Sequence, residues 1–244
     1  MSGGATRLRR LEDPDDPGLA ELSGLLHAAF ADPDTVLELD RMQAFLARAG
    51  AATDRHFCVV VAEEAGVLVG GTVFSYVPAT NCGFSEYLVA RKERHGQGIG
   101  RLLFEARRAL LNQRANDSGQ PSCSGLFIEA DNPQRTPLDL QIRERVTAMD
   151  AVTRLRLFAH LGFLRVDLEY VQPALGPGKS PVRYLDLLFA PWDEHIRQQA
   201  RVPGVWVTET LCPIWKSWSN ASSECEALRQ RLGTSTLTLR SLVS

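Results

Sequence analysis

His95-Gly-Gln-Gly-Ile-Gly100 is the most informative segment of this chain, and it follows the apolar segment Phe84 to Ala90. The earlier segment has the character of a strand, whereas the residues from Gly100 to Ala115 have helical spacing of apolar side chains. The glycines therefore lie between a strand and a helix. Backbone N–H groups can approach a phosphate at such a junction, and the start of the helix adds positive potential. We expect an anion-binding site there, with Arg91, Lys92, Arg94 and Arg101 around it.

Other glycine-rich structures fit this junction less well. Three glycines also form an ordinary flexible turn, and taken alone they would favour that interpretation. A Rossmann loop needs GxGxxG after an early parallel strand, but position 101 is arginine and the preceding strand ends a meander. A P-loop needs Gly-Lys-Ser/Thr, which the segment lacks.

The order of segments along the chain predicts helices, an antiparallel meander, a strand-helix-strand-helix section and two closing strands. One helix is expected to follow the capping segment Asp13-Pro-Asp-Asp-Pro17 and to run to about Phe30, and a second to run from about Thr35 to Ala49. One long helix or two abutting helices are expected between Ile142 and Leu161, and a terminal helix from Ser223 to Leu232. The expected strands cover residues 7–11, 57–62, 67–77, 84–90, 125–131, 163–172 and 182–189.

This order, with the glycine junction inside it, resembles the GNAT superfamily. Its members carry Arg/Gln-x-x-Gly-x-Gly/Ala after the fourth strand, where this chain reads His95-Gly-Gln-Gly-Ile-Gly-Arg-Leu-Leu103. Gly162-Phe163 matches a frequent Gly-Phe pair of the family, and the similarity covers roughly Arg7 to Pro191. The resemblance implies an α/β (α+β) fold, with a central mixed, mostly antiparallel sheet of about seven strands flanked by helices. Residues 1–190 would form this domain. Residues 191–244, which hold all four tryptophans, would form a C-terminal extension packed on it or an oligomer contact.

The resemblance also implies acetyl-CoA as the co-substrate. Backbone N–H groups of this loop hold the CoA pyrophosphate in the family, which assigns that role to Gly96, Gln97, Gly98, Ile99, Gly100 and Arg101. His95 stands where the family has arginine or glutamine, and Arg94 or Gln97 could compensate. Leu88, Val89 and Ala90 complete the expected cofactor-binding set, with a backbone N–H near Leu88 or Val89 as the oxyanion donor.

Glu86 is the first candidate for the base that removes a proton from the amine. It lies nine residues before His95, where many family members carry a glutamate, and strand alternation places it on one face with Phe84, Leu88 and Ala90. The alternative is an edge carboxylate in solvent or in a salt bridge. Glu129 and Asp131 on the next strand are second candidates, although carboxylates near a strand end are equally common without a function.

The general acid is less clear from the sequence. Many relatives have a tyrosine four residues before the glycine of the Gly-Phe pair, and here that residue is Phe158. Tyr170 or Tyr87 could replace it, with Tyr170 as the assigned residue; His160 could also do so, or the thiolate could leave unaided. Loss of catalysis is a further possibility.

Composition and charge favour a small-molecule partner. The net charge is -2, and basic residues are interleaved with acids, so nucleic acid is not an expected partner. No segment approaches the roughly 20 apolar residues that span a bilayer, so no membrane contact is expected. The five cysteines are widely spaced without a CxxC pair, which favours reduced thiols, a cytoplasmic protein and no metal. A homodimer is compatible with the tryptophan-rich extension.

Two functions from different classes follow from these features. The first is an N-acetyltransferase that moves the acetyl group of acetyl-CoA to the amine of a small molecule by direct attack in a ternary complex. The second is a CoA-binding or sensory module on the same fold that performs no chemistry, which the phenylalanine at position 158 makes credible.

Overall fold

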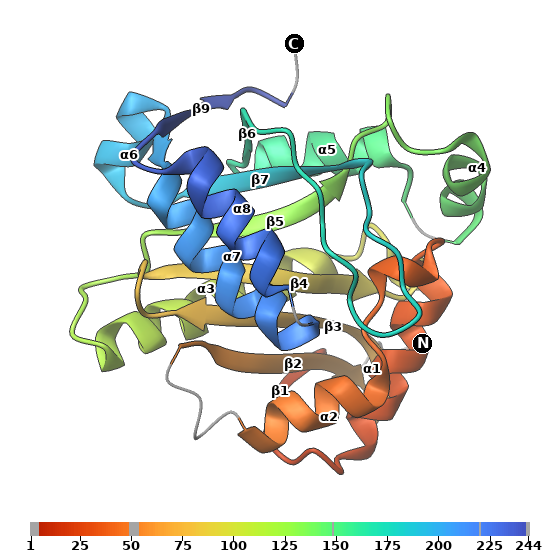
Figure 1. Ribbon diagram of the computed structural model, residues 1–244. Coiled ribbons are helices and arrows are strands. Elements are labelled where there is room, and N and C mark those ends of the chain that lie inside the picture. Colours follow the sequence, from red (N-terminus) through yellow and green to blue (C-terminus); the bar gives the residue numbers. More distant parts are fainter. Residues whose placement is uncertain (1–4, 49–53, 148, 220, 243–244) are drawn as a thin grey trace.

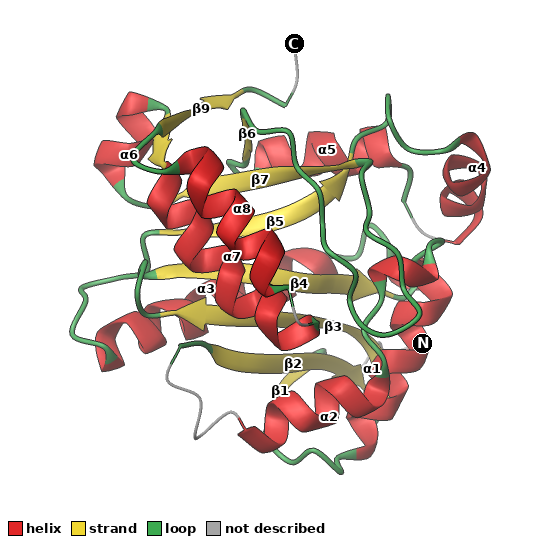
Figure 2. Cartoon of the chain, viewed as in Figure 1, coloured by secondary structure: helices red, strands yellow, loops and turns green. Residues whose placement is uncertain are grey.

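The computed structural model describes residues 5–48, 54–147, 149–219 and 221–242, and these form one nine-stranded sheet with helices on both faces (Figure 1, Figure 2). The strands follow the order β1-β2-β3-β4-β5-β7-β6-β9-β8 across the sheet. Among the described strands, every neighbouring pair is antiparallel except β4 and β5. Their bounds are β1 Arg7–Leu11, β2 His56–Glu64, β3 Val67–Val77, β4 Cys82–Ala90, β5 Gly125–Asp131, β6 Leu164–Val166, β7 Leu185–Pro191, β8 Arg201–Pro203 and β9 Thr236–Arg240.

The helices cover the two faces of the sheet unequally. In Figure 1, α1, α2, α7 and α8 lie in front of the sheet and α3 lies behind it. Because both faces are covered, β2 and β3 are apolar on both sides: Val59 and Val61 join the front core, whereas Val60 and Ala62 join the rear core. The helix bounds are α1 Pro17–Ala29, α2 Leu39–Arg48, α3 Ile99–Asp117, α4 Leu138–Thr147, α5 Ala151–His160, α6 Glu194–Gln199, α7 Gly204–Trp218 and α8 Ser222–Leu232.

The predicted fold class is confirmed, with differences in detail. The two strands beyond the expected seven, β8 and β9, come from the extension, and β9 pairs with β6. The strand expected over residues 163–172 is too long, because only Leu164–Val166 pairs continuously and Gln172 makes an isolated bridge to Val182. Two helices, α4 and α5, replace the single long helix that was the other option. Ala49, the expected end of the second helix, lies outside the described residues.

Candidate functional site

The parallel pair β4 and β5 separates part of the way along its length. Hydrogen-bonded register between them ends at Ser85 and Ile128, although β4 continues to Ala90 and β5 continues to Asp131 against β7. Figure 1 shows β4 and β5 diverging toward their carboxyl ends. We call the place where their pairing ends the vertex. Beyond it, backbone groups on this side of β4 have no strand to pair with, so they are available to a ligand.

A β-bulge at the vertex determines which face of the sheet the side chains of Glu86 and the following residues occupy. Val73 of β3 pairs with Tyr87, and the next residue, Phe74, pairs with Ser85, so Glu86 is the extra residue of β4. Such a bulge bends the strand and shifts the alternation of side chains by one. Glu86 therefore stays on the front face with Phe84, which lies opposite Ser75.

The bulge corrects one prediction from the sequence. Leu88 and Ala90 were expected on the face of Glu86, but both pack against the rear core. Strict alternation fails because the extra residue reverses the direction of every side chain that follows it.

Glu86 lies in a buried ion pair. Its side chain is 0% exposed, and its Oε1 accepts from the guanidinium of Arg55 at 3.2 Å and from the hydroxyl of Ser75 at 2.9 Å. Arg55 in turn stacks on the ring of Phe45, 4.4 Å from its centroid. Burial raises the pKa of Glu86 to about 6, and the charge of Arg55 limits the rise. The salt bridge considered for Glu86 is thus present, and it lies inside the molecule.

Glu129 is the residue that follows the last paired position of β5, so it faces Glu86 across the vertex. Its carboxylate accepts a short hydrogen bond from the Tyr170 hydroxyl and another, at 2.5 Å, from Nε2 of Gln172. Burial raises the pKa of Glu129 to about 7, against the lowering effect of these hydrogen bonds, and the charge of Glu86 adds to the rise. The structure therefore brings together three of the predicted residues, Glu86, Glu129 and Tyr170.

The other candidate acids and bases have different surroundings. The Tyr87 hydroxyl donates to the carbonyl of Thr35 at 3.0 Å and accepts from the N–H of Leu37, which fixes the segment between α1 and α2. Asp131 pairs with Arg154 of α5. His160 is exposed at the end of α5. None of these three side chains bonds to the two glutamates in the described part of the chain.

The glycine junction has the backbone conformation that a left-handed turn requires. Gly96 and Gly98 have φ of 76° and 85°, and Gly98 is the N-cap of α3. The N–H groups of Ile99, Gly100 and Arg101, in the first turn of α3, donate to no protein acceptor among the described residues. A Cβ added at Gly96 or Gly98 would meet nothing within 4 Å, and at Gly100 only Leu88 at 3.8 Å. The space beside these glycines is open, which is compatible with a diphosphate.

Side chains beside the loop turn away from it toward the protein. The imidazole of His95 lies 3.1 Å from the carbonyl oxygen of Ala90. Arg94 pairs with Glu64 at 2.7 Å and also donates to Gln97. Any anion at this junction would therefore be held by backbone N–H groups, with the exposed Arg101 in the first turn of α3 as a side-chain cation.

Comparison with known proteins gives the family. The model of the acetyltransferase (GNAT) family matches residues 19–133, which run from α1 to just beyond β5. Residues 19–133 thus match the GNAT family, and the chain has the GNAT fold. No curated protein matches the chain.

Solved structures with the same fold include two at a TM-score of 0.51. A GNAT-family acetyltransferase from Bacteroides thetaiotaomicron is 16% identical, and the match covers 79% of this chain and 94% of that chain. The PaiA N-acetyltransferase from Thermoplasma acidophilum, solved with coenzyme A, is 10% identical, with 77% and 99% covered. At these identities the likeness shows the GNAT fold alone.

Helix α7 covers the front face of this GNAT domain beside the vertex. Trp215 lies 6.1 Å from the ring of Tyr170, and Trp218 lies 5.8 Å from the ring of Phe84. Arg41 of α2 donates to the carbonyls of Ser217 and Trp218 at the end of α7, which holds the helix in place. The extension thus encloses the face that carries both glutamates.

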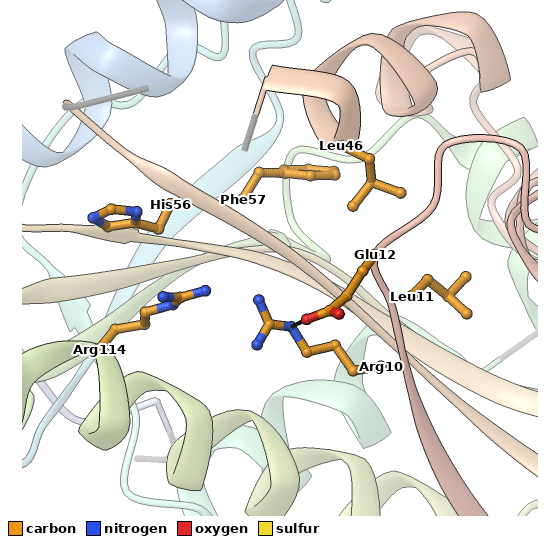
Figure 3. Close-up of a pocket in the computed structure, with 7 residues that line it drawn as sticks. All are labelled: Arg10, Leu11, Glu12, Leu46, His56, Phe57 and Arg114. Atoms are coloured by element: carbon orange, nitrogen blue, oxygen red, sulfur yellow. Dashed lines mark ion pairs between the residues drawn. The ribbon is translucent and has the colours of Figure 1, made fainter. Parts of the chain in front are cut away.

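A cavity of about 320 Å³ lies at the other end of the sheet (Figure 3). It opens where β2 begins, at His56 and Phe57, whereas the glycine junction follows the end of β4. Two arginines, Arg10 and Arg114, point into it (Figure 3). This cavity is therefore separate from the vertex.

The described residues contain no group of three or more His, Cys, Asp or Glu side chains that could hold a metal ion. None of the described helices is long and apolar enough to cross a membrane.

Sequence reasoning missed several residues of the site. Arg55 and Gln172 belong to no motif, and only the folded chain brings them to the glutamates. Arg107 did carry a signal: it follows Leu103 and precedes Leu111 at helical spacing, so an arginine stands in a buried apolar stripe of α3.

Proposed function

We propose that the protein is an N-acetyltransferase that moves the acetyl group of acetyl-CoA to the amine of a small molecule by direct attack in a ternary complex. One observation carries this proposal: two carboxylates with raised pKa values, Glu86 and Glu129, face each other where β4 and β5 part. A base that works near neutral pH needs a pKa in this range. The GNAT fold makes acetyl transfer the reaction that such a base would serve.

The glycine junction is the proposed binding site for the CoA pyrophosphate. Its open space and unpaired N–H groups support this, and backbone donors need no help from the side chain at His95. Acetyl-CoA would supply the acetyl group and a thiolate leaving group. Leu88, Val89 and Ala90 lie on β4 beyond the vertex, where an unpaired backbone N–H could stabilise the oxyanion.

The two glutamates are proposed to act as one proton acceptor. Their charges interact, so at neutral pH the pair takes up a proton more readily than either carboxylate would alone. The described residues that donate to Glu129, Tyr170 and Gln172, are neutral, so protonating Glu129 removes the partner of no described cation. The negative charge of Glu86 balances the positive charge of Arg55. The second carboxylate oxygen of Glu86, Oε2, accepts no hydrogen bond from the described residues. An amine N–H would supply a donor.

Tyr170 is the second proposed catalytic side chain. Its proposed role differs from the general acid that was expected from the sequence. Its hydroxyl donates to Glu129 on the front face, away from Phe158, which packs on the rear core. We propose that it holds the Glu129 carboxylate toward the vertex and exchanges a proton with it. Tyr170 therefore serves the attacking amine.

The partner is proposed to be a small amine, because α7 leaves little room beside the glutamates. A cytoplasmic location fits the five cysteines, all free and buried in the described chain. The homodimer stays a prediction.

Release of CoA thiol across a panel of amines, polyamines, amino acids and aminoglycosides tests the proposal. Wild-type protein should turn over at least one of them. Glu86→Gln and Glu129→Gln should each lower turnover at least a hundredfold while CoA affinity, measured by calorimetry, changes little. Glu105→Gln, an exposed glutamate of α3, is the control and should match the wild type.

Two outcomes would contradict the proposal. Tight CoA binding without turnover of any amine would replace the enzyme by a non-catalytic CoA-binding module. Turnover that survives both glutamine substitutions would remove the proposed proton acceptor.

A further inference from the structure

Arg107 of α3 is a buried cation that forms no ion pair with any described residue. It is 2% exposed, and its only hydrogen bond among the described residues runs from Nη1 to the hydroxyl of Ser85. Its Nε has no partner, and no described carboxylate lies within ion-pair distance of its guanidinium. Burial lowers its pKa to about 9, against the raising effect of the more distant Glu86 charge, so the guanidinium is still charged at neutral pH.

Two other arginines in the described interior, Arg55 and Arg154, have carboxylate partners. Arg55 pairs with Glu86, and Arg154 pairs with both Asp131 and Glu144. A buried charge without such compensation is strongly destabilising. Arg107 differs from both, and an anion that arrives during function would explain the presence of an arginine at this position.

The position of Arg107 links it to the vertex. Ser85, its hydrogen-bond partner, is the last residue of β4 that pairs with β5. Arg107 approaches the vertex from the rear face, opposite the side that carries Glu86. It is seven residues beyond Gly100 in α3, or about 10 Å along the helix axis. A molecule held at the glycine junction and extended toward the vertex would meet this guanidinium.

The surroundings of Arg107 include the position where many GNAT relatives have a tyrosine. Phe158 packs on Phe163 with ring centroids 5.4 Å apart, and Phe163 packs on Phe104 at 6.3 Å. The guanidinium of Arg107 lies 5.2 Å from the ring of Phe104. Phe158, which has no proton to transfer, and Arg107 are therefore both linked to the rear core through Phe163 and Phe104.

We infer that Arg107 stabilises the departing CoA thiolate by charge, in place of a proton from a tyrosine at position 158. This rests on the proposed function. The amine nitrogen forms the new C–N bond, the C–S bond breaks, and its electron pair stays on sulfur beside the guanidinium. The amine proton goes to the Glu86 and Glu129 pair, and Arg107 keeps its own protons. A charge-assisted hydrogen bond of this kind is among the strong ones in proteins.

Bound CoA itself provides the test, without any acceptor amine. The thiol of CoA bound to the full chain is titrated by its thiolate absorbance, with the unliganded protein subtracted. An ordinary thiol has a pKa near 8.5. In the wild type the pKa of the bound thiol should be at least one unit below this value. At pH values well below the pKa, its thiolate fraction is then at least tenfold larger than that of an ordinary thiol. Arg107→Gln should return the thiol pKa to about 8.5, and Arg107→Lys should keep part of the effect.

Arg108→Gln is the matched control, since Arg108 is the exposed neighbour on the same helix and lies over Trp192. It should leave the thiol pKa at the wild-type value. A wild-type thiol pKa at or above 8.5 overturns the inference, and so does a lowered value that survives Arg107→Gln. The wild-type titration decides alone if Arg107→Gln does not fold. Failure of the proposed function is separate: it shows as absent CoA binding or absent turnover in the wild type.

Discussion

At the scale of single residues, the site depends on how Glu129 is held. Its carboxylate accepts from Tyr170 and Gln172, while the other amide atom of Gln172, Oε1, has no donor among the described residues. Rotating the Gln172 amide would turn this oxygen toward Glu129. It would then accept the proton of a neutral Glu129. Gln172 can therefore serve both protonation states of Glu129, as a proton acceptor in a catalytic cycle requires.

The raised pKa of Glu129 has a consequence for stability. Its ordinary value is 4.5 and its folded value about 7, so the native state binds more protons than the unfolded state between these pH values. Stability contributed by this group is therefore present below about pH 4.5 and is lost as pH rises to about 7. The difference between the two pKa values corresponds to roughly 3 kcal/mol in the free energy of unfolding at most.

Glu129→Gln should remove this loss, because an amide does not ionise and can still bond to Tyr170 and Gln172. We expect the variant to be about 2 kcal/mol more stable than the wild type at pH 8, and nearly equal to it at pH 4.5. Urea unfolding at the two pH values measures this. Glu105→Gln, in solvent, should show no such difference. A Glu129→Gln variant that is less stable at pH 8 would show that the carboxylate is held as a stabilising charge.

At the scale of elements, the glycine junction depends on two left-handed residues. Alanine at Gly98, where φ is 85°, should cost about 1 kcal/mol of stability and distort the N–H groups that open α3. We expect Gly98→Ala to weaken CoA binding at least tenfold in calorimetry.

Gly119→Ala provides the control for backbone strain. Gly119 follows α3 with φ of 78°, and a Cβ there also meets nothing within 4 Å. Both variants should lose similar stability in thermal unfolding, but Gly119→Ala should keep wild-type CoA affinity. Equal losses of affinity would show that general destabilisation weakens binding, and unchanged affinity in Gly98→Ala would move the CoA site elsewhere.

The elements also show what the sequence could predict. Glycines at fixed spacing after an apolar strand are a local signal, so the junction and the helix after it were predicted correctly. The bulge at Glu86 has no such signal, because one extra residue in an apolar strand looks like any other. The pairing of Glu86 with Arg55 depends on β2, β3 and β4 meeting in register, and spacing along the chain does not encode it.

At the scale of the whole molecule, the extension is continuous with the GNAT sheet. The composition shift after Pro191 indicated a separate segment, and its last helix was predicted within one residue. Nothing local indicated that β9 would pair with β6 or that Trp218 would pack on Phe84. Both contacts join residues far apart in the chain, so they follow from the folded sheet alone.

This integration leads to a prediction about truncation. The front core contains Leu211, Trp215 and Trp218 of α7, together with apolar residues of α8, all of them buried. Removing residues 204–244 would expose the apolar side of β3 and β4, leave β6 without β9, and take away the carbonyls that bind Arg41. Burial of a large apolar side chain contributes about 2 kcal/mol, so the combined loss exceeds the whole stability of a typical domain.

We therefore expect a chain of residues 1–203 to lose cooperative thermal unfolding and near-ultraviolet circular dichroism, even though it contains the family match and the glycine junction. A point substitution distinguishes this loss of the whole fold from a local effect at the site. Arg41→Gln removes one anchor of α7 and should lower stability by about 1 to 3 kcal/mol while the chain stays folded. A truncated chain that folds cooperatively and binds CoA would show instead that α7 and α8 form a detachable cover. The two glutamates would then be open to amines larger than those proposed.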